Sequence, residues 1–203
     1  MLVVRAAIMR TSDTTAPLSA TFGGVSMTPA VTMTDTSGSN RFYRTTIFYL
    51  VNPSTSAGNV VIDASFTVQG AYIAVVTLLG VDTSSPVGVT ATDSVASATD
   101  NSLALVGCSA ESLILAMVES NSALAPSWTW STATEDFDLA GANDAAEIAG
   151  SGAYYAVPSA GNVTLTASRS LSSVRIIGAA AEFKAAPLSS MTLKAIYYAG
   201  MMG

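Results

Sequence analysis

Apolar and polar residues alternate with a period of two along most of the chain. In the segment 42–51, the even-numbered residues share one face of a strand and the odd-numbered residues share the other. Pro53 ends this strand, because proline has no N–H to donate to a neighbouring strand. Residues 60–66 then resume the alternating pattern. The pattern therefore predicts a strand, a turn and a returning strand in this region.

Similar signals recur along the chain, and no segment shows a long helical period. Further strands are predicted at 2–9, 20–22, 25–27, 72–79, 103–108, 113–118, 128–130, 152–157, 162–168 and 174–183. Many short strands with turn residues between them are typical of antiparallel sandwiches and barrels. We predict an all-β fold, an antiparallel two-sheet sandwich with a jelly-roll-like strand order. One domain spans residues 1–186, followed by a short C-terminal tail at 187–203.

The pentapeptide Ser-Ala-Gly-Asn-Val occurs twice, at 56–60 and at 159–163. Each copy follows a proline that ends an aromatic strand, and each precedes a strand with alternating residues. Gly58 tolerates a positive φ and asparagine, as at Asn59, is the next most tolerant residue type, so this pentapeptide suits a turn. We favour a shared turn requirement, and an internal duplication of the chain stays open as the alternative.

Composition narrows the classes of function. Charged residues make up only 11% of the chain, its net charge is −6, and lysine and arginine do not cluster, which argues against a nucleic-acid partner. Histidine, the commonest general base and transition-metal ligand, is absent. The single cysteine, Cys108, lies in an apolar strand-like run and reads as a small buried hydrophobe. We therefore expect no enzymatic activity, no metal and no cofactor.

Neither a secretion signal nor a membrane span is expected. The N-terminal apolar run is short and contains Arg5 and Arg10. The longer charge-free stretch 64–81 contains serine, threonine, glutamine and glycine, a composition typical of a core strand after a turn.

Two groups of residues are candidates for chemistry or recognition. Acidic residues concentrate between 135 and 147, and their spacing favours a solvated acidic loop over a cation site or a carboxylate pair. Trp128 and Trp130 share one side of a predicted strand. Such a pair suits a sandwich core or a subunit interface, and the alternative is a platform for sugar rings.

The order of signals resembles a β-sandwich module of phage virion proteins and of bacterial surface or secreted proteins. The resemblance covers roughly residues 2 to 186. It is carried by the order of the stretches LVVRAAIMRTS, ATFGGVSMTP, TIFYLVNP, GNVVIDAS, AVVTLLGVDTSSPVG, SLILAMVES, GSGAYYAVPSAGNVTLTAS and RIIGAAAEFKAA. It implies the fold class and, more loosely, a structural role, and it brings no catalytic residues.

The tail after Ala186 is apolar, with Lys194 as its only charge. A free tail of this composition would expose a large apolar surface. We expect it to bury its side chains against another subunit, and docking on its own domain is the alternative. The predicted contact residues are Leu188, Met191, Leu193, Ile196, Tyr197, Tyr198, Met201 and Met202.

These observations together predict a non-enzymatic structural protein of a phage-like particle. The expected role is that of a capsid decoration (cement) protein or of a tail or spike component, located in the virion. Its expected partners are copies of itself and other virion proteins, such as a major capsid or tail protein. The alternative is a surface or adhesion module that binds host-surface glycans through Trp128 and Trp130.

Overall fold

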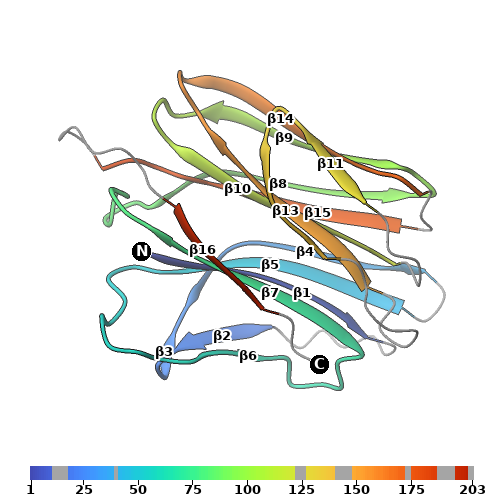
Figure 1. Ribbon diagram of the computed structural model, residues 1–203, viewed down its shortest axis with the longest axis horizontal. Helices are drawn as coiled ribbons and strands as arrows, with labels where there is room; N and C mark the ends of the chain where they lie inside the picture. The colour runs from blue at the N-terminus through green and yellow to red at the C-terminus, as the bar shows by residue number, and fades with distance from the viewer. Residues whose placement is uncertain are drawn as a thin grey trace.

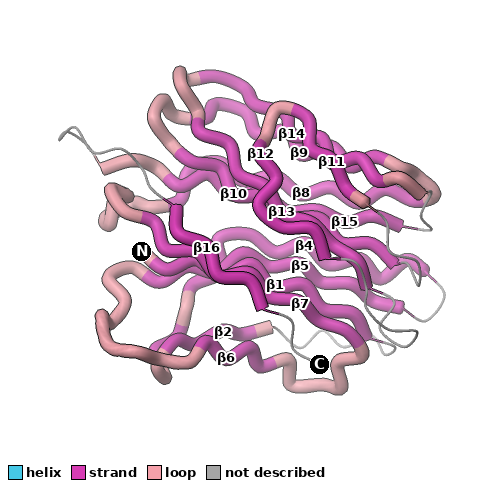
Figure 2. Tube along the Cα trace, viewed as in Figure 1, coloured by secondary structure: helices cyan, strands magenta, loops and turns pink. Residues whose placement is uncertain are grey.

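The fold is all-β. The computed structural model describes residues 1–10, 18–38, 41–121, 127–139, 148–171, 175–186 and 195–200. It has 71% strand and no helix among these residues (Figure 2). The predicted all-β class is therefore confirmed. In the described part of the chain, no helix is available that could cross a membrane.

Two larger sheets, each of five antiparallel strands, form the centre of the molecule. The first central sheet contains, in order, β16 (Ala195–Gly200), β7 (Gly70–Leu78), β1 (Leu2–Arg10), β5 (Arg41–Leu50) and β4 (Thr28–Gly38). The second central sheet contains β12 (Thr134–Leu139), β13 (Ile148–Ala156), β10 (Leu113–Asn121), β15 (Arg175–Phe183) and β8 (Val87–Ala96).

Two smaller sheets of three strands lie on the outside of the central pair (Figure 1). The first outer sheet contains β3 (Val25–Ser26), β2 (Ser19–Phe22) and β6 (Val60–Asp63). The second outer sheet contains β11 (Trp128–Ser131), β14 (Gly161–Arg169) and β9 (Asp100–Cys108).

The four sheets stack as layers, with a hydrophobic core between each neighbouring pair. The largest core joins the two central sheets and includes Val3, Ile47 and Leu115. A second core joins the first central sheet to the first outer sheet, and a third joins the second central sheet to the second outer sheet. The sequence predicted two sheets, whereas the described residues form four.

Inner strands of the central sheets, such as β1 and β15, are buried on both faces, which explains the additional layers. All nine residues of β1 are buried, with Val3 and Ala7 in the core between the central sheets and Val4 and Ile8 in the core under the first outer sheet. A strand with alternating apolar and polar residues packs against another sheet on one face only. A strand that is apolar on both faces, such as β1, needs a packed layer against each face.

The two central sheets have the same strand order. Reading the second sheet from β8, each strand corresponds to one in the first sheet: β8 to β16, β15 to β7, β10 to β1, β13 to β5, and β12 to β4. Both sheets have a β-bulge in corresponding edge strands, between Pro29 and Val31 in β4 and between Glu135 and Phe137 in β12.

The residue registers agree as well. Val3 pairs with Tyr49 on one side and with Val76 on the other. Leu115 of the second sheet pairs in the same way with Tyr154 and with Ala181. This correspondence covers strands well beyond the repeated pentapeptide. It favours the internal duplication, which the sequence left as the alternative explanation of the repeat.

The first half of the chain contains β1 to β7 and the second half contains β9 to β15. Each half is followed by a strand that pairs with the other half. β8 follows the first half in the chain but pairs with β15 of the second half. β16 follows the second half but pairs with β7 of the first half. Each half therefore completes the central sheet of the other.

A cut between the halves tests this exchange. We expect a chain with a protease site inserted at Ala98, in the turn between β8 and β9, to stay whole after cleavage. The shared central core and the two exchanged strands should hold the fragments together. Size-exclusion chromatography with light scattering should give the 20.6 kDa mass of the uncut chain, the matched control. Fragments that separate without denaturant would contradict the exchange.

The repeated turns occupy nearly equivalent places. Gly58 and Asn59 lie between β5 and β6, as predicted. Gly161 and Asn162 are the first two residues of β14, so the second turn closes just before them, at 157–160. The second pair therefore begins its strand, where the prediction placed it between the two strands.

Candidate functional site

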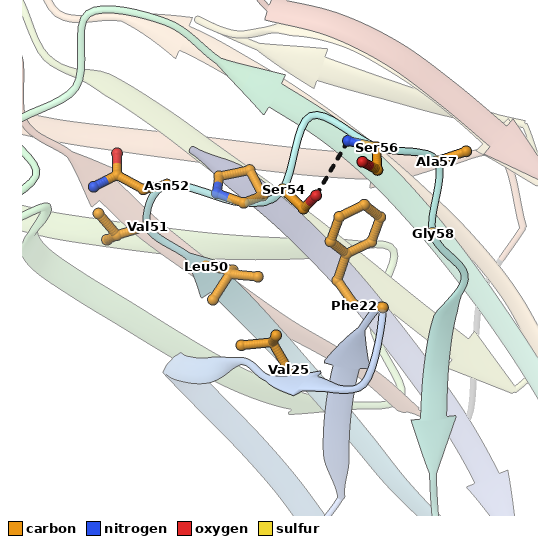
Figure 3. Close-up of a pocket in the computed structure, with 11 residues that line it drawn as sticks. Phe22, Val25, Leu50, Val51, Asn52, Ser54, Ser56, Ala57 and Gly58 are labelled. Carbon is orange, nitrogen blue, oxygen red and sulfur yellow. Dashed lines mark hydrogen bonds between the residues drawn. The ribbon is translucent and has the colours of Figure 1, made fainter.

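A groove on the first outer sheet is the candidate site for recognition. It has a volume of about 300 Å³ and lies between the β2–β3 hairpin and the segment that joins β5 to β6 (Figure 3). Its lining comprises Phe22, Gly23, Val25, Leu50, Val51, Asn52, Pro53, Ser54, Ser56, Ala57 and Gly58.

Glycines shape this groove. Gly23 and Gly24 have φ values of 55° and 82°, the left-handed conformation that a two-residue hairpin turn requires. The N–H of Gly23 donates to the carbonyl of Asn59 at 3.0 Å, which ties the hairpin to the β5–β6 turn. A Cβ on Gly58 would lie 3.2 Å from Cζ of Phe22, so a larger residue would crowd the phenyl ring.

The chemistry of the groove is apolar with a rim of small polar groups. Phe22, Leu50 and Val51 are partly buried, whereas Val25 is 56% exposed. Ser56 donates its backbone N–H to Oγ of Ser54 at 3.1 Å, so one rim hydroxyl is already engaged (Figure 3). No lining residue carries a charge. The groove therefore suits an uncharged apolar segment.

Both walls of this groove are predicted from the sequence as separate features, but their contact is not. The sequence predicts strands at 20–22 and 25–27 for one wall and a turn at Gly58 and Asn59 for the other. Their contact depends on the stacking of β2 against β6, a pairing of segments about forty residues apart that periodicity does not report.

The tryptophan pair lies inside the molecule. Trp128 is 3% exposed and packs with Val118 and Ile176 between the second central and second outer sheets. Trp130 is partly buried, and its Nε1–H donates to Oγ of Ser151 at 2.8 Å. A sugar ring cannot stack on Trp128 in this arrangement. The structure thus matches the core role for this residue rather than the glycan platform.

The acidic segment is in part a strand rather than a solvated loop. Residues 134–139 form β12, and the β-bulge after Glu135 turns Asp136 towards the interior. Asp136 forms a buried ion pair with Arg5, whose Nη1 also donates to the carbonyl of Ala116 at 3.1 Å. The expected solvated loop is wrong for Asp136, because its carboxylate is paired with Arg5 on β1, whereas Glu135 and Asp138 are exposed on the strand. Asp144 and Glu147 lie outside the described residues.

A second carboxyl group lies deeper in the central core. Glu119 on β10 is completely buried, and its Oε1 accepts a hydrogen bond from Oγ1 of Thr45 at 2.8 Å. Within the described residues, Oε2 has no hydrogen-bond partner. Burial raises the pKa of Glu119 from 4.5 to about 8. The group is therefore largely protonated at neutral pH.

Tyr72 lies beside this carboxyl group. Its hydroxyl donates to the carbonyl of Val118 at 2.6 Å, and its pKa is raised well above 10, first by burial and then by the charge of Glu119. Arg5, Asp136, Glu119 and Tyr72 join β1, β12, β10 and β7 across the central core. We call these four residues the polar lock. Their hydrogen bonds and burial fit a role in holding the two halves in register.

Other reactive groups are scarce in the described residues. No cluster of three or more histidine, cysteine, aspartate or glutamate side chains is placed to hold a metal ion in this part of the chain. Cys108 is buried, and burial raises the pKa of its thiol. A protonated buried thiol is a weak nucleophile.

The predicted tail contacts are described only in part. The backbone of Ile196, Tyr197 and Tyr198 lies in β16, which pairs with β7 of the same chain. The remaining predicted contacts, Leu188, Met191, Leu193, Met201 and Met202, lie outside the described residues. Burial of the tail side chains against another subunit stays a prediction.

Comparisons with known proteins give no family. A scan against protein-family models, a search of curated proteins and a search of solved structures each found no match. The resemblance to phage and bacterial surface modules therefore stays an expectation from the sequence.

Proposed function

We propose that this chain is a non-enzymatic structural protein of a phage-like particle. Within that class we propose a capsid decoration (cement) protein, or a tail or spike component, that stabilises the shell through contacts with neighbouring subunits. Its partners would be copies of itself and a major capsid or tail protein, and its location the virion. A jelly-roll-like strand order belongs to the same proposal.

The observation that carries this proposal is the combination of a four-layer stack with an uncharged outer groove. Four layers, an extensive core and exchanged strands suit a protein under mechanical load, because separating the halves would break both sheet pairing and core packing. The groove lies on an outer sheet, and Val25 and Val61 are more than half exposed on that layer. Apolar surface of this kind is typical of protein contacts.

Electron microscopy of the native source tests the function directly. Gold-labelled antibodies against the chain should decorate particles at regular spacing in a lysate of the source cells. Label confined to cell surfaces, or to soluble material that carries no particles, would overturn the proposal. The groove prediction below can fail without affecting this result, because another face could make the contacts.

The groove makes a specific prediction about these contacts. We expect Val25→Glu to weaken binding to particles that lack the protein by about 10-fold or more, because a charge would enter an uncharged contact. Co-sedimentation of the purified chain with the particles measures this. Val106→Glu is the matched control, since Val106 is 70% exposed on the second outer sheet. Equal binding by both variants would remove the groove as a contact site.

A further inference from the structure

One buried arginine has no counter-charge among the residues that the structure describes. Arg169, the last residue of β14, is 4% exposed and lies between the second outer and second central sheets. Among the described residues, no acceptor forms a hydrogen bond with its Nε or with either Nη. Its guanidinium contacts the ring of Trp128, with 5.5 Å between Cζ and the ring centroid. Burial lowers the pKa of Arg169.

Other arginines show what is missing here. Arg5 pairs with Asp136, and Arg175 pairs with Asp35. No described carboxylate lies within ion-pair distance of Arg169. A buried charge without a partner is strongly unfavourable, so proteins usually pair such a group or keep it in water.

Further polar groups without partners lie near the same end of this layer. Trp128 pairs with Arg169 across β11 and β14, and its Nε1–H has no acceptor in the described residues. Asn101 pairs with Ala167, two residues before Arg169, and neither polar atom of its side-chain amide has a partner there. Ser120, opposite Ile176 on the facing sheet, also has a hydroxyl without a partner in the described part of the chain.

These groups are mainly hydrogen-bond donors. A guanidinium, an indole N–H and an amide NH₂ together offer a positive charge and several N–H groups, whereas the acceptors among them are only one amide oxygen and one hydroxyl. A cation site needs acceptor oxygens, so these buried donors around a positive charge do not suit a cation. They match a ligand with a negative charge and several acceptor oxygens.

We propose that Arg169, Trp128 and Asn101 form a binding site for an oxyanion, a carboxylate or phosphate group. Arg169 supplies the positive charge and a bidentate hydrogen-bond donor. Trp128 covers one face of the guanidinium and donates through Nε1–H. The amide of Asn101 donates a further hydrogen bond. Ser120 lies on the facing sheet as an additional hydroxyl. The inference is independent of the proposed function.

The two tryptophans provide an internal control. In ¹H–¹⁵N spectra of the labelled full-length chain, the Trp128 indole signal should move saturably as sodium phosphate or sodium acetate is added. The Trp130 indole signal should stay in place, because its N–H already bonds to Ser151. Sodium chloride at equal ionic strength is the reference, and Trp130→Phe assigns the two signals. Movement with phosphate alone, or with acetate alone, identifies the oxyanion. The absence of a specific movement with both salts overturns the site.

A thermal measurement tests the role of the charge. Phosphate or acetate at ten times its dissociation constant should raise the melting temperature of the wild-type chain by roughly 3–6 °C relative to chloride. Arg169→Met should lose this shift and should melt in chloride at or above the wild-type temperature, because it removes an unpaired buried charge. An Arg169→Met chain that keeps the shift would overturn the proposal.

A structural role for the guanidinium predicts the opposite pattern. Arg169→Met would then melt well below the wild type in chloride, and neither salt would stabilise the wild-type chain. If Arg169→Met does not fold, Arg169→Lys serves instead: it keeps the charge but loses the two-pronged geometry, so the anion-dependent shift should shrink by at least half. An unchanged shift in Arg169→Lys would contradict the assigned geometry.

Discussion

Replacing Asp136 with alanine is expected to lower the free energy of unfolding by about 3–5 kcal/mol. The variant leaves the guanidinium of Arg5 fully buried and without its carboxylate partner. The ring of Phe137 would remain, 4.8 Å from Cζ of Arg5, but an aromatic face compensates a buried cation only in part. Urea unfolding followed by fluorescence measures the loss.

Two further variants test whether the loss of stability comes from the unpaired buried charge of Arg5. Asp138→Ala, on the same strand, removes a carboxylate that only accepts the backbone N–H of Trp128 at 3.1 Å, so its expected loss is about 1 kcal/mol. The double variant Arg5→Met with Asp136→Leu should recover most of the stability, because an apolar pair avoids the desolvation of both charges. Similar losses for Asp136→Ala and Asp138→Ala would show that the buried pair is not a dominant contact.

Sequence periodicity located the strands that have neighbours on both sides. Every predicted strand overlaps a strand of the structure, including β1, β7, β10 and β15. The strands that the sequence did not predict are β4, β8, β12 and β16, and all four are edge strands of the central sheets. Edge strands tolerate proline and polar residues because one side forms no ladder, which weakens the pattern that identifies a strand.

The number of stacked sheets could not be predicted from the alternation of apolar and polar residues alone. β1 was correctly read as a strand, but its apolar residues on both faces imply a layer on each side. From the sequence, Arg5 within that run indicates only a charge that argues against a signal peptide. Its partner Asp136 lies 131 positions away in a segment read as a loop, so neither residue alone indicated a buried pair.

The sequence shows the duplication only as a short repeat, and this repeat alone favours a shared turn requirement. The two readings agree in the structure, because equivalent strands require equivalent turns. Tyr49 and Tyr154, which occupy the same register position in the two central sheets, lie 105 positions apart, close to the spacing of the repeated pentapeptide. Most other equivalent positions differ, as in Val76 and Ala181, which hides the repeat from sequence comparison.

The polar groups that matter for the candidate sites were largely invisible from sequence. Glu119 and Arg169 each follow directly after a predicted strand, at 113–118 and 162–168, where a single charge is typical of a solvent-facing residue. Glu119 lies inside because β10 is buried on both faces, and Arg169 lies inside because it occupies the inward face of β14. The tryptophan pair is the exception, since its aromatic character favours a sandwich core or a subunit interface over a sugar platform, and Trp128 lies in a core.

The stability of the protein is expected to fall as the pH rises from about 4.5 to about 8, because of Glu119. The folded state keeps the proton on this carboxyl group until its pKa of about 8, whereas the unfolded chain releases it near 4.5. Stabilisation from the protonated form is therefore complete below pH 4.5 and lost by pH 8. The slope is about 1.4 kcal/mol per pH unit, with a total of roughly 3–5 kcal/mol.

Glu119→Gln isolates this contribution. The amide keeps the shape and can still accept the hydrogen bond from Thr45, but it has no proton to lose. The difference in unfolding free energy between the variant and the wild type should grow in favour of the variant from pH 5 to pH 8.5 and then level off. Other carboxyl groups with raised pKa values, such as Glu135 and Asp138, titrate in both proteins and cancel in the difference. Urea unfolding at several pH values measures both curves. Parallel curves would show that Glu119 is ionised or solvated in the folded state, and that the polar lock is held by the Arg5–Asp136 pair without it.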